Sequence, residues 1–209
     1  MNQPRDHRGD NEEQSKVFDY LSVLTSVIIG FGLSNLLAGY ASLIQAWRTV
    51  VPCWLYFAWI ILLLPLYFIY WWSFWDYRKQ VKWTFFGFSF LLSGPIVLYI
   101  VTSLLLPSPT VGASFNSFIF YLNVRHWMFG LWIILQIWGI LLAPYLKTGF
   151  KWGSFFNSYK FAQYILLAAF TVGLFSSGHS LAVDAGILVI FYLVLIYLMN
   201  TYRRTLARS

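Results

Sequence analysis

Charged side chains are scarce in this sequence, and their scarcity excludes most classes of soluble protein. Only 10% of the residues are Asp, Glu, Lys or Arg, whereas 59% are hydrophobic. In soluble globular domains about a quarter of the residues are charged. A chain of this composition is expected to be an integral membrane protein. It is expected to have one domain, because apolar segments and the short connections between them use nearly all of its 209 residues.

The sequence also lacks the residues and motifs on which most catalytic and metal sites depend. Cys53 is the only cysteine, which excludes an intramolecular disulfide and a cluster of cysteine ligands. Neither Gly-x-Ser-x-Gly nor His-Glu-x-x-His occurs. We therefore assign no catalytic residue, no metal site and no cofactor. An intramembrane enzyme, for instance one acting on lipids, is the least favoured function.

The formal net charge of +7 does not indicate nucleic-acid binding. The basic residues stand at the ends of apolar segments, where Lys and Arg orient membrane helices and contact anionic lipid headgroups. The expected partners are therefore the lipid bilayer and the anionic headgroups beside the basic cytoplasmic loops. Nucleic acid is not expected as a partner.

Six apolar segments are present that we interpret as membrane-spanning helices, each of which needs about 20 residues. The predicted fold is thus all-α, an integral membrane bundle of six transmembrane helices within residues 18–203. Residues 1–17 are expected to form a disordered cytoplasmic tail, and residues 204–209 a basic one. In the longest connection, apolar residues at helical spacing over 115–122 predict a short interfacial helix. The predicted spans are 19–46, 53–75, 83–106, 126–145, 159–175 and 180–202.

The distribution of Lys and Arg predicts the orientation of these spans. If the amino terminus is cytoplasmic, twelve of these residues lie on the cytoplasmic side, and only Arg48 and Arg125 lie on the other. This asymmetry follows the positive-inside rule, and it favours an even number of spans. We therefore expect both termini in the cytoplasm.

Small residues recur at every fourth position of the first span. Positions four apart lie along one side of a helix, so they form a groove of low bulk into which a second helix can pack. The second helix is either another span of the same chain or the same span of a second subunit, and the sequence leaves both open. This small-residue ladder consists of Ser22, Ser26, Gly30, Ser34, Ala38 and Ser42.

Prolines interrupt two consecutive spans, and we expect each to kink its helix. Pro65 lies in the middle of the second span, and Pro95 follows Gly94 in the third. A proline inside a helix removes one backbone donor and leaves a carbonyl without its helical partner. Such kinks either line a cavity or are tolerated because neighbouring helices bond the freed groups.

Asp184 is an acidic residue about one turn inside the sixth span. An ionisable group in a span is costly and is therefore a candidate functional residue. With the predicted orientation, Arg125, His126 and His179 belong to the same outer end of the protein. Together they could bind a small ligand or transfer a proton; alternatively, Asp184 pairs with Arg125 or caps its helix. The histidines come from different connections, so their spacing carries no metal signature.

Two stretches of the chain resemble a family of uncharacterised bacterial six-span membrane proteins of similar length. They are FDYLSVLTSVIIGFGLSNLLAG, in the first span, and GPIVLYIVTSLLLP, in the third. The resemblance implies a location in the bacterial cytoplasmic (inner) membrane and a shared helical bundle. It implies no activity and no site residues.

Two functions are compatible with these features. The first is a multi-pass membrane protein that binds or transports a small or lipid-like molecule, at a site formed by the kinked spans and the residues around Asp184. The alternative is a non-catalytic accessory or sensor subunit of a membrane complex, which acts through helix association along the ladder, and a homo-oligomer is one such assembly. A packed interior would favour the second function.

Overall fold

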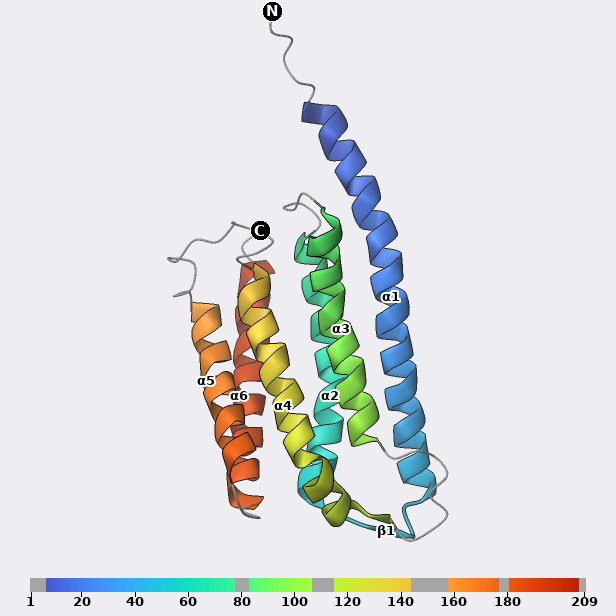
Figure 1. The fold of residues 1–209 in the computed structure, drawn as a ribbon, viewed down its shortest axis with the longest axis vertical. Coiled ribbons are helices and arrows are strands. Elements are labelled where there is room, and N and C mark those ends of the chain that lie inside the picture. The colour runs from blue at the N-terminus through green and yellow to red at the C-terminus, as the bar shows by residue number, and fades with distance from the viewer. Residues whose placement is uncertain (1–6, 78–82, 107–114, 144–157, 177–180, 207–209) are drawn as a thin grey trace, which may run out of the picture.

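The computed structural model describes residues 7–77, 83–106, 115–143, 158–176 and 181–206. These residues form six α-helices that run side by side (Figure 1). Four of them are long and apolar enough to cross a membrane: Phe18–Gln45, Trp54–Phe74, Phe85–Leu105 and Ser117–Leu141. The all-α prediction is confirmed, and four helices of this length and composition indicate a membrane protein.

The helices are α1 (His7–Gln45), α2 (Trp54–Phe74), α3 (Phe85–Leu105), α4 (Ser117–Ala143), α5 (Ser158–Phe175) and α6 (Leu181–Leu206). A short 3-10 helix, η1 (Trp75–Tyr77), follows α2. The apolar parts of α5 and α6, Phe161–Phe175 and Leu181–Tyr197, are shorter than the other four. They correspond to the predicted fifth and sixth spans.

The helices surround the centre of the bundle in the order α1, α3, α4, α5, α6, α2, and α2 also contacts α3 and α4. Consecutive helices run in opposite directions, so the start of α1 and the end of α6 lie at the same end of the bundle (Figure 1). We call this the terminal end. At the other end, which we call the far end, α1, α3 and α5 finish and α2, α4 and α6 begin.

α1 begins at His7, so residues 7–17 are helical where the sequence predicted a disordered tail. Glu12, Glu13 and Gln14 are good helix formers. Nucleation is the costly step in helix formation, and the helix is already nucleated in the apolar segment that follows. The helix therefore extends towards the amino terminus without needing apolar burial.

α4 begins at Ser117, so the separate interfacial helix predicted over 115–122 does not exist. Most of those residues form the first turns of α4. The side chain of Asn116 caps this helix by accepting the backbone N–H groups of Phe118 and Ile119, at 3.1 and 3.2 Å. Just before the helix, β2 (Phe115–Asn116) pairs in parallel with β1 (Val50–Val51), which ties the α3–α4 connection to the α1–α2 connection.

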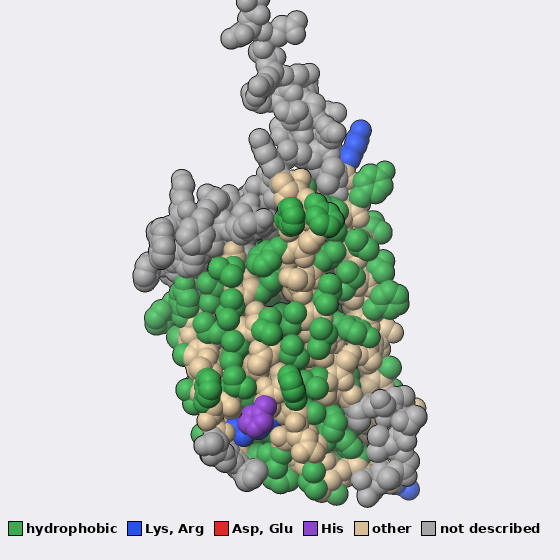
Figure 2. Space-filling view, in the orientation of Figure 1, with side chains coloured by type: hydrophobic (Ala, Val, Ile, Leu, Met, Phe, Trp, Pro, Cys, Tyr) green, Lys and Arg blue, Asp and Glu red, His purple; other side chains and the backbone are tan. Residues whose placement is uncertain are grey.

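Aromatic rings fill the centre of the bundle between α2, α4, α5 and α6. Trp59 of α2 is fully buried and lies within 6.3 Å, centroid to centroid, of four other buried rings. The outer surface is also largely apolar, and Figure 2 shows hydrophobic side chains over most of the visible face of the helices. The four rings around Trp59 are Phe129, Trp132, Phe170 and Phe191.

Candidate functional site

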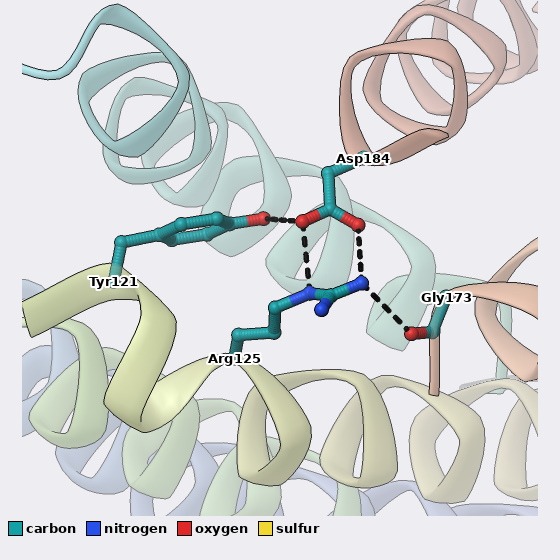
Figure 3. Close-up of polar contacts among 4 residues, drawn as sticks. All are labelled: Tyr121, Arg125, Gly173 and Asp184. Carbon is teal, nitrogen blue, oxygen red and sulfur yellow. Dashed lines mark hydrogen bonds and ion pairs between the residues drawn. The ribbon is translucent and has the colours of Figure 1, made fainter. Parts of the chain in front are cut away.

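A buried polar cluster lies at the far end, where α4, α5 and α6 meet. Asp184 lies in the first turn of α6. Arg125 and Tyr121 are one turn apart on α4, so their side chains lie on the same face of that helix. Gly173 contributes its backbone carbonyl from the last turn of α5. Figure 3 shows the four residues converging from the three helices.

Both oxygens of the Asp184 carboxylate have partners. The Arg125 Nη2 group donates to Asp184 Oδ1 at 3.0 Å, and the Tyr121 hydroxyl donates to Oδ2 at 2.9 Å. Arg125 Nε also lies 2.9 Å from Oδ2, as an ion-pair contact without the geometry of a hydrogen bond. Nη2 donates further to the carbonyl of Gly173 at 3.3 Å. The ion pair is thus bound into a network that spans three helices.

The network is removed from solvent, which makes the pairing of its charges essential. The side chains of Arg125 and Asp184 are only 4% and 2% exposed, and Tyr121 is fully buried. An unpaired charge at such a position costs several kcal/mol. The guanidinium also lies over the ring of Phe129, 5.8 Å from its centroid, which adds a cation–π contact.

The orientation of the ion pair matches the dipoles of the two helices it connects. Arg125 donates to a carbonyl at the carboxyl end of α5, where helical carbonyls lack partners and a positive charge is favoured. Asp184 lies at the amino end of α6, where a negative charge is favoured. The pair therefore stabilises both helix ends of the α5–α6 hairpin.

Gly173 lets α5 approach the other two helices closely. A Cβ at this position would lie 2.8 Å from Ile187 Cδ1 of α6 and 3.0 Å from Phe129 Cζ of α4. A larger residue here would require the side chain of Ile187 or the ring of Phe129 to shift.

Of the four residues predicted for this site, the structure brings only Arg125 and Asp184 together. His126 is exposed, and within the described part of the chain no hydrogen bond or ion pair reaches it. His179 lies outside the described residues. Among the residues that are described, no group of three or more His, Cys, Asp or Glu side chains is placed to hold a metal ion.

Sequence reasoning missed Tyr121, Gly173 and Phe129. Tyr121 and Phe129 lie four residues before and after Arg125, so the helical repeat placed them on the Arg125 face. That signal was lost because Tyr121 was assigned to an interfacial helix. No pattern in the sequence marked the carbonyl of Gly173.

Neighbouring helices bond two carbonyls just before Pro95, one of which the proline frees. α3 continues through Pro95, which leaves the carbonyl of Leu91 without a helical donor. The Tyr70 hydroxyl of α2 donates to this carbonyl at 2.7 Å. The indole N–H of Trp138, on α4, donates to the carbonyl of Phe90, also at 2.7 Å. At Pro95, therefore, the group freed by the proline is bonded by a neighbouring helix, as the second of the two sequence alternatives expects.

Pro65 likewise lies inside a continuous helix, α2. Tyrosines from two neighbouring helices donate to backbone carbonyls of α2 in the two turns before the proline. Tyr40 of α1 bonds the carbonyl of Ile60 at 2.7 Å, and Tyr192 of α6 bonds that of Ala58 at 3.1 Å. These bonds attach α2 to helices on both of its sides.

The middle of the small-residue ladder of α1 does not pack against the other described helices. Gly30, Ser34 and Ala38 are exposed, and nothing lies within 4 Å of a Cβ built at Gly30. Ser22, Ser26 and Ser42 are half-buried. The alternative in which the ladder packs against another subunit stays a prediction.

α1 contacts α2 and α3 through a different stripe, whose residues are spaced alternately four and three apart. Two glycines in this stripe allow close approach: a Cβ at Gly32 would clash with Tyr67 of α2, and one at Gly39 would lie 2.5 Å from Leu106 Cδ1. At 3.6 residues per turn, the exposed Ser34 falls on the opposite side of α1. The buried stripe is Thr25, Ile29, Gly32, Leu36, Gly39 and Leu43.

Two buried indole groups in the aromatic centre have no acceptor among the described residues. They belong to Trp59 and Trp132, which are 0% and 2% exposed. The Trp59 N–H approaches the Tyr121 hydroxyl without forming a hydrogen bond of ordinary geometry. Unpaired donors in such surroundings are destabilising.

No protein-family model, no curated protein and no solved structure matches this chain.

Proposed function

We propose that this chain is a multi-pass membrane protein in which all six helices cross the bilayer, and that it acts as a non-catalytic subunit of a membrane complex. In this proposal both termini are cytoplasmic. The location in a bacterial inner membrane rests on the sequence resemblance alone.

Helix lengths and directions support six crossings. α5 has 18 residues, and a helix of that length is about 27 Å long, close to the hydrocarbon thickness of a bilayer. Because consecutive helices alternate in direction, the α2–α3 and α4–α5 connections leave the bundle at the terminal end. By sequence these two connections contain five basic residues, Arg78, Lys79, Lys82, Lys147 and Lys151, and Lys160 follows in the first turn of α5. The positive-inside rule places that end in the cytoplasm.

The interior of the bundle favours association over ligand binding as the function. The carboxylate of Asp184 is saturated by Arg125 and Tyr121, and the carbonyl freed by Pro95 is bonded by Tyr70. Buried aromatic rings contact one another at the centre. Two of the features that suggested a ligand site, Asp184 and the carbonyl freed by Pro95, thus have partners within the bundle.

The observation that carries the proposal is the outward position of Gly30, Ser34 and Ala38 on α1. In membrane proteins, small residues are enriched where two helices pack closely, because they let the backbones approach and add van der Waals contact. On α1 they lie on the side that the other described helices leave uncovered. A helix of another subunit would fit there.

The test is chemical crosslinking in native membranes, with size analysis of the complex in mild detergent. Replacing Gly30 and Ser34 by Leu should abolish the crosslinked complex, because the added bulk fills the groove. Gly186→Leu is the matched control, since Gly186 is also an exposed helical glycine with nothing near its Cβ. Two differently tagged copies of the chain show whether the partner is a second copy. Association that survives in the Gly30→Leu/Ser34→Leu variant contradicts the proposal.

A small or lipid-like ligand is the second candidate, favoured by the two unpaired indole donors of Trp59 and Trp132. A bound acceptor oxygen would change their fluorescence. Reconstituted protein titrated with lipids extracted from its host membrane should show a saturable change that Trp59→Phe reduces. No saturable change would eliminate this candidate.

A further inference from the structure

The α5–α6 hairpin is the part of the bundle least suited to enter a membrane on its own. Its two apolar stretches, Phe161–Phe175 and Leu181–Tyr197, are the shortest of the six. α6 also contains Asp184 in its first turn, and a carboxylate within a span opposes insertion.

Arg125 is positioned to remove the second obstacle and to bind the end of α5 as well. Its guanidinium neutralises Asp184 of α6 and bonds the carbonyl of Gly173 at the end of α5. Arg125 belongs to α4, which precedes the hairpin in the chain and packs against α5. The pairing group is therefore already in place when the hairpin is made.

We propose that Arg125 is the residue that commits the α5–α6 hairpin to the membrane, by acting as the docking site for both of its far-end helix termini. This inference rests on the proposed six-span arrangement. Without the guanidinium, Asp184 lacks its counter-ion and the carbonyl of Gly173 lacks its donor. In a fraction of the chains, α6 or the whole hairpin then fails to cross the membrane. Position 209 is left outside the cell in the first case, and position 176 is left in the cytoplasm in the second.

The charge distribution makes the inference distinguishable from the positive-inside rule. Arg125 lies at the far end, outside the cytoplasm in the proposed orientation. By the charge rule alone, Arg125→Leu removes an outer positive charge and strengthens the proposed topology. If Arg125 docks the hairpin, Arg125→Leu should instead weaken the proposed topology. Arg48→Leu is the matched control, because Arg48 is an exposed arginine in the α1–α2 connection at the same end.

The experiment maps the positions of single cysteines in intact and permeabilised cells with a membrane-impermeant thiol reagent. Cys53, the only cysteine, is buried and is replaced by Ala. Reporters are introduced one at a time as Ser176→Cys after α5, Ser209→Cys at the carboxyl terminus and Thr49→Cys after α1. With Arg125 present, positions 49 and 176 should react from outside, and position 209 only after permeabilisation. A different pattern refutes the six-span topology itself.

Arg125→Leu should raise the wrong-side labelling of position 176 or 209 about tenfold or more, since a buried charge that loses its partner costs several kcal/mol. Position 49 should not change, and Arg48→Leu should behave like the parent. Arg125→Leu combined with Asp184→Leu should restore the parent pattern. The charge swap Arg125→Asp with Asp184→Arg should not, because each charge would then face a helix end of its own sign.

Two results would overturn the inference. One is an Arg125→Leu variant with the parent labelling at positions 176 and 209, which would mean that the hairpin enters without docking. The other is loss of correct labelling at position 49 as well, which would mean that the ion pair supports the whole bundle and has no specific role in the hairpin.

Discussion

The hydroxyl of Tyr70 should matter only because residue 95 is a proline. Its oxygen lies 2.7 Å from the carbonyl oxygen of Leu91, the group that Pro95 deprives of its helical donor. Tyr70→Phe removes the hydroxyl and keeps the ring, which stacks on Trp138 with centroids 5.8 Å apart. Leu91 is only 1% exposed, so its carbonyl is left without a donor from the solvent.

The expected cost follows from the burial of that carbonyl. A buried acceptor without a donor costs about 1–3 kcal/mol, and interhelical hydrogen bonds in membranes average about 0.6 kcal/mol with a maximum near 1.7. Tyr70→Phe should therefore lower the free energy of unfolding by about 1–1.5 kcal/mol. In a Pro95→Ala background, residue 95 supplies an N–H to Leu91, and the same substitution should cost less than about 0.5 kcal/mol.

The assay is equilibrium unfolding of the four proteins of this double-mutant cycle in mixed detergent micelles, followed by tryptophan fluorescence. The quantity of interest is the coupling free energy between the two positions, expected to be about 1 kcal/mol. Equal costs of Tyr70→Phe in both backgrounds would refute the reasoning, because the hydroxyl would then act independently of the proline.

Three further substitutions test other contacts by the same unfolding assay. Tyr121→Phe removes a 2.9 Å hydrogen bond to the buried Asp184 and should cost about 1.5–3 kcal/mol, since the acceptor is charged; a cost below 0.5 kcal/mol would contradict this. Gly32→Ala should cost about 1–3 kcal/mol through its clash with Tyr67, whereas Gly30→Ala should be neutral or stabilising; equal effects would mean that the contact face of α1 is wrong. Trp59→Phe should change stability by less than about 1 kcal/mol, because the small cavity it creates is offset by loss of an unpaired buried donor; a loss above about 2 kcal/mol would show that this N–H has a partner.

The sequence predicts the helices of this fold well because hydrophobicity over some 20 residues depends little on tertiary contacts. The observed bounds of α2, α3 and α5 lie within two residues of the predicted spans. The start of α4 was missed because it depends on one local device, the cap formed by Asn116. A polar residue before an apolar stretch is too common to indicate such a cap by itself.

The sequence allowed the Arg125–Asp184 ion pair to be predicted as one possibility. The helix ends and the backbone carbonyl that the pair contacts could not be predicted. A charge in a span needs a partner, and Arg125 was the partner that the sequence offered for Asp184. Which helix ends the pair would join depends on the packing of α4 against α5 and α6. The carbonyl of Gly173 has no side-chain signature, so only the fold reveals it.

The stripe of α1 that packs against its own chain was not identified from the sequence, for a geometric reason. Positions four apart advance by 400°, so a ladder at that spacing drifts around the helix by 40° at each step. A stripe with alternate spacings of four and three stays on one side, as Ile29, Gly32 and Leu36 do. Only two residues of that stripe are glycines, so the search for small residues did not identify the stripe.

Site-specific photocrosslinking from α1 tests the proposed association most directly. A photoreactive residue at Ser34 or Ala38 should give a protein adduct in native membranes, because these positions face away from the bundle. The same residue at Val189 of α6, which is 56% exposed, should react with lipid alone. Adducts with lipid alone at all three positions would contradict the proposal that this chain acts through α1.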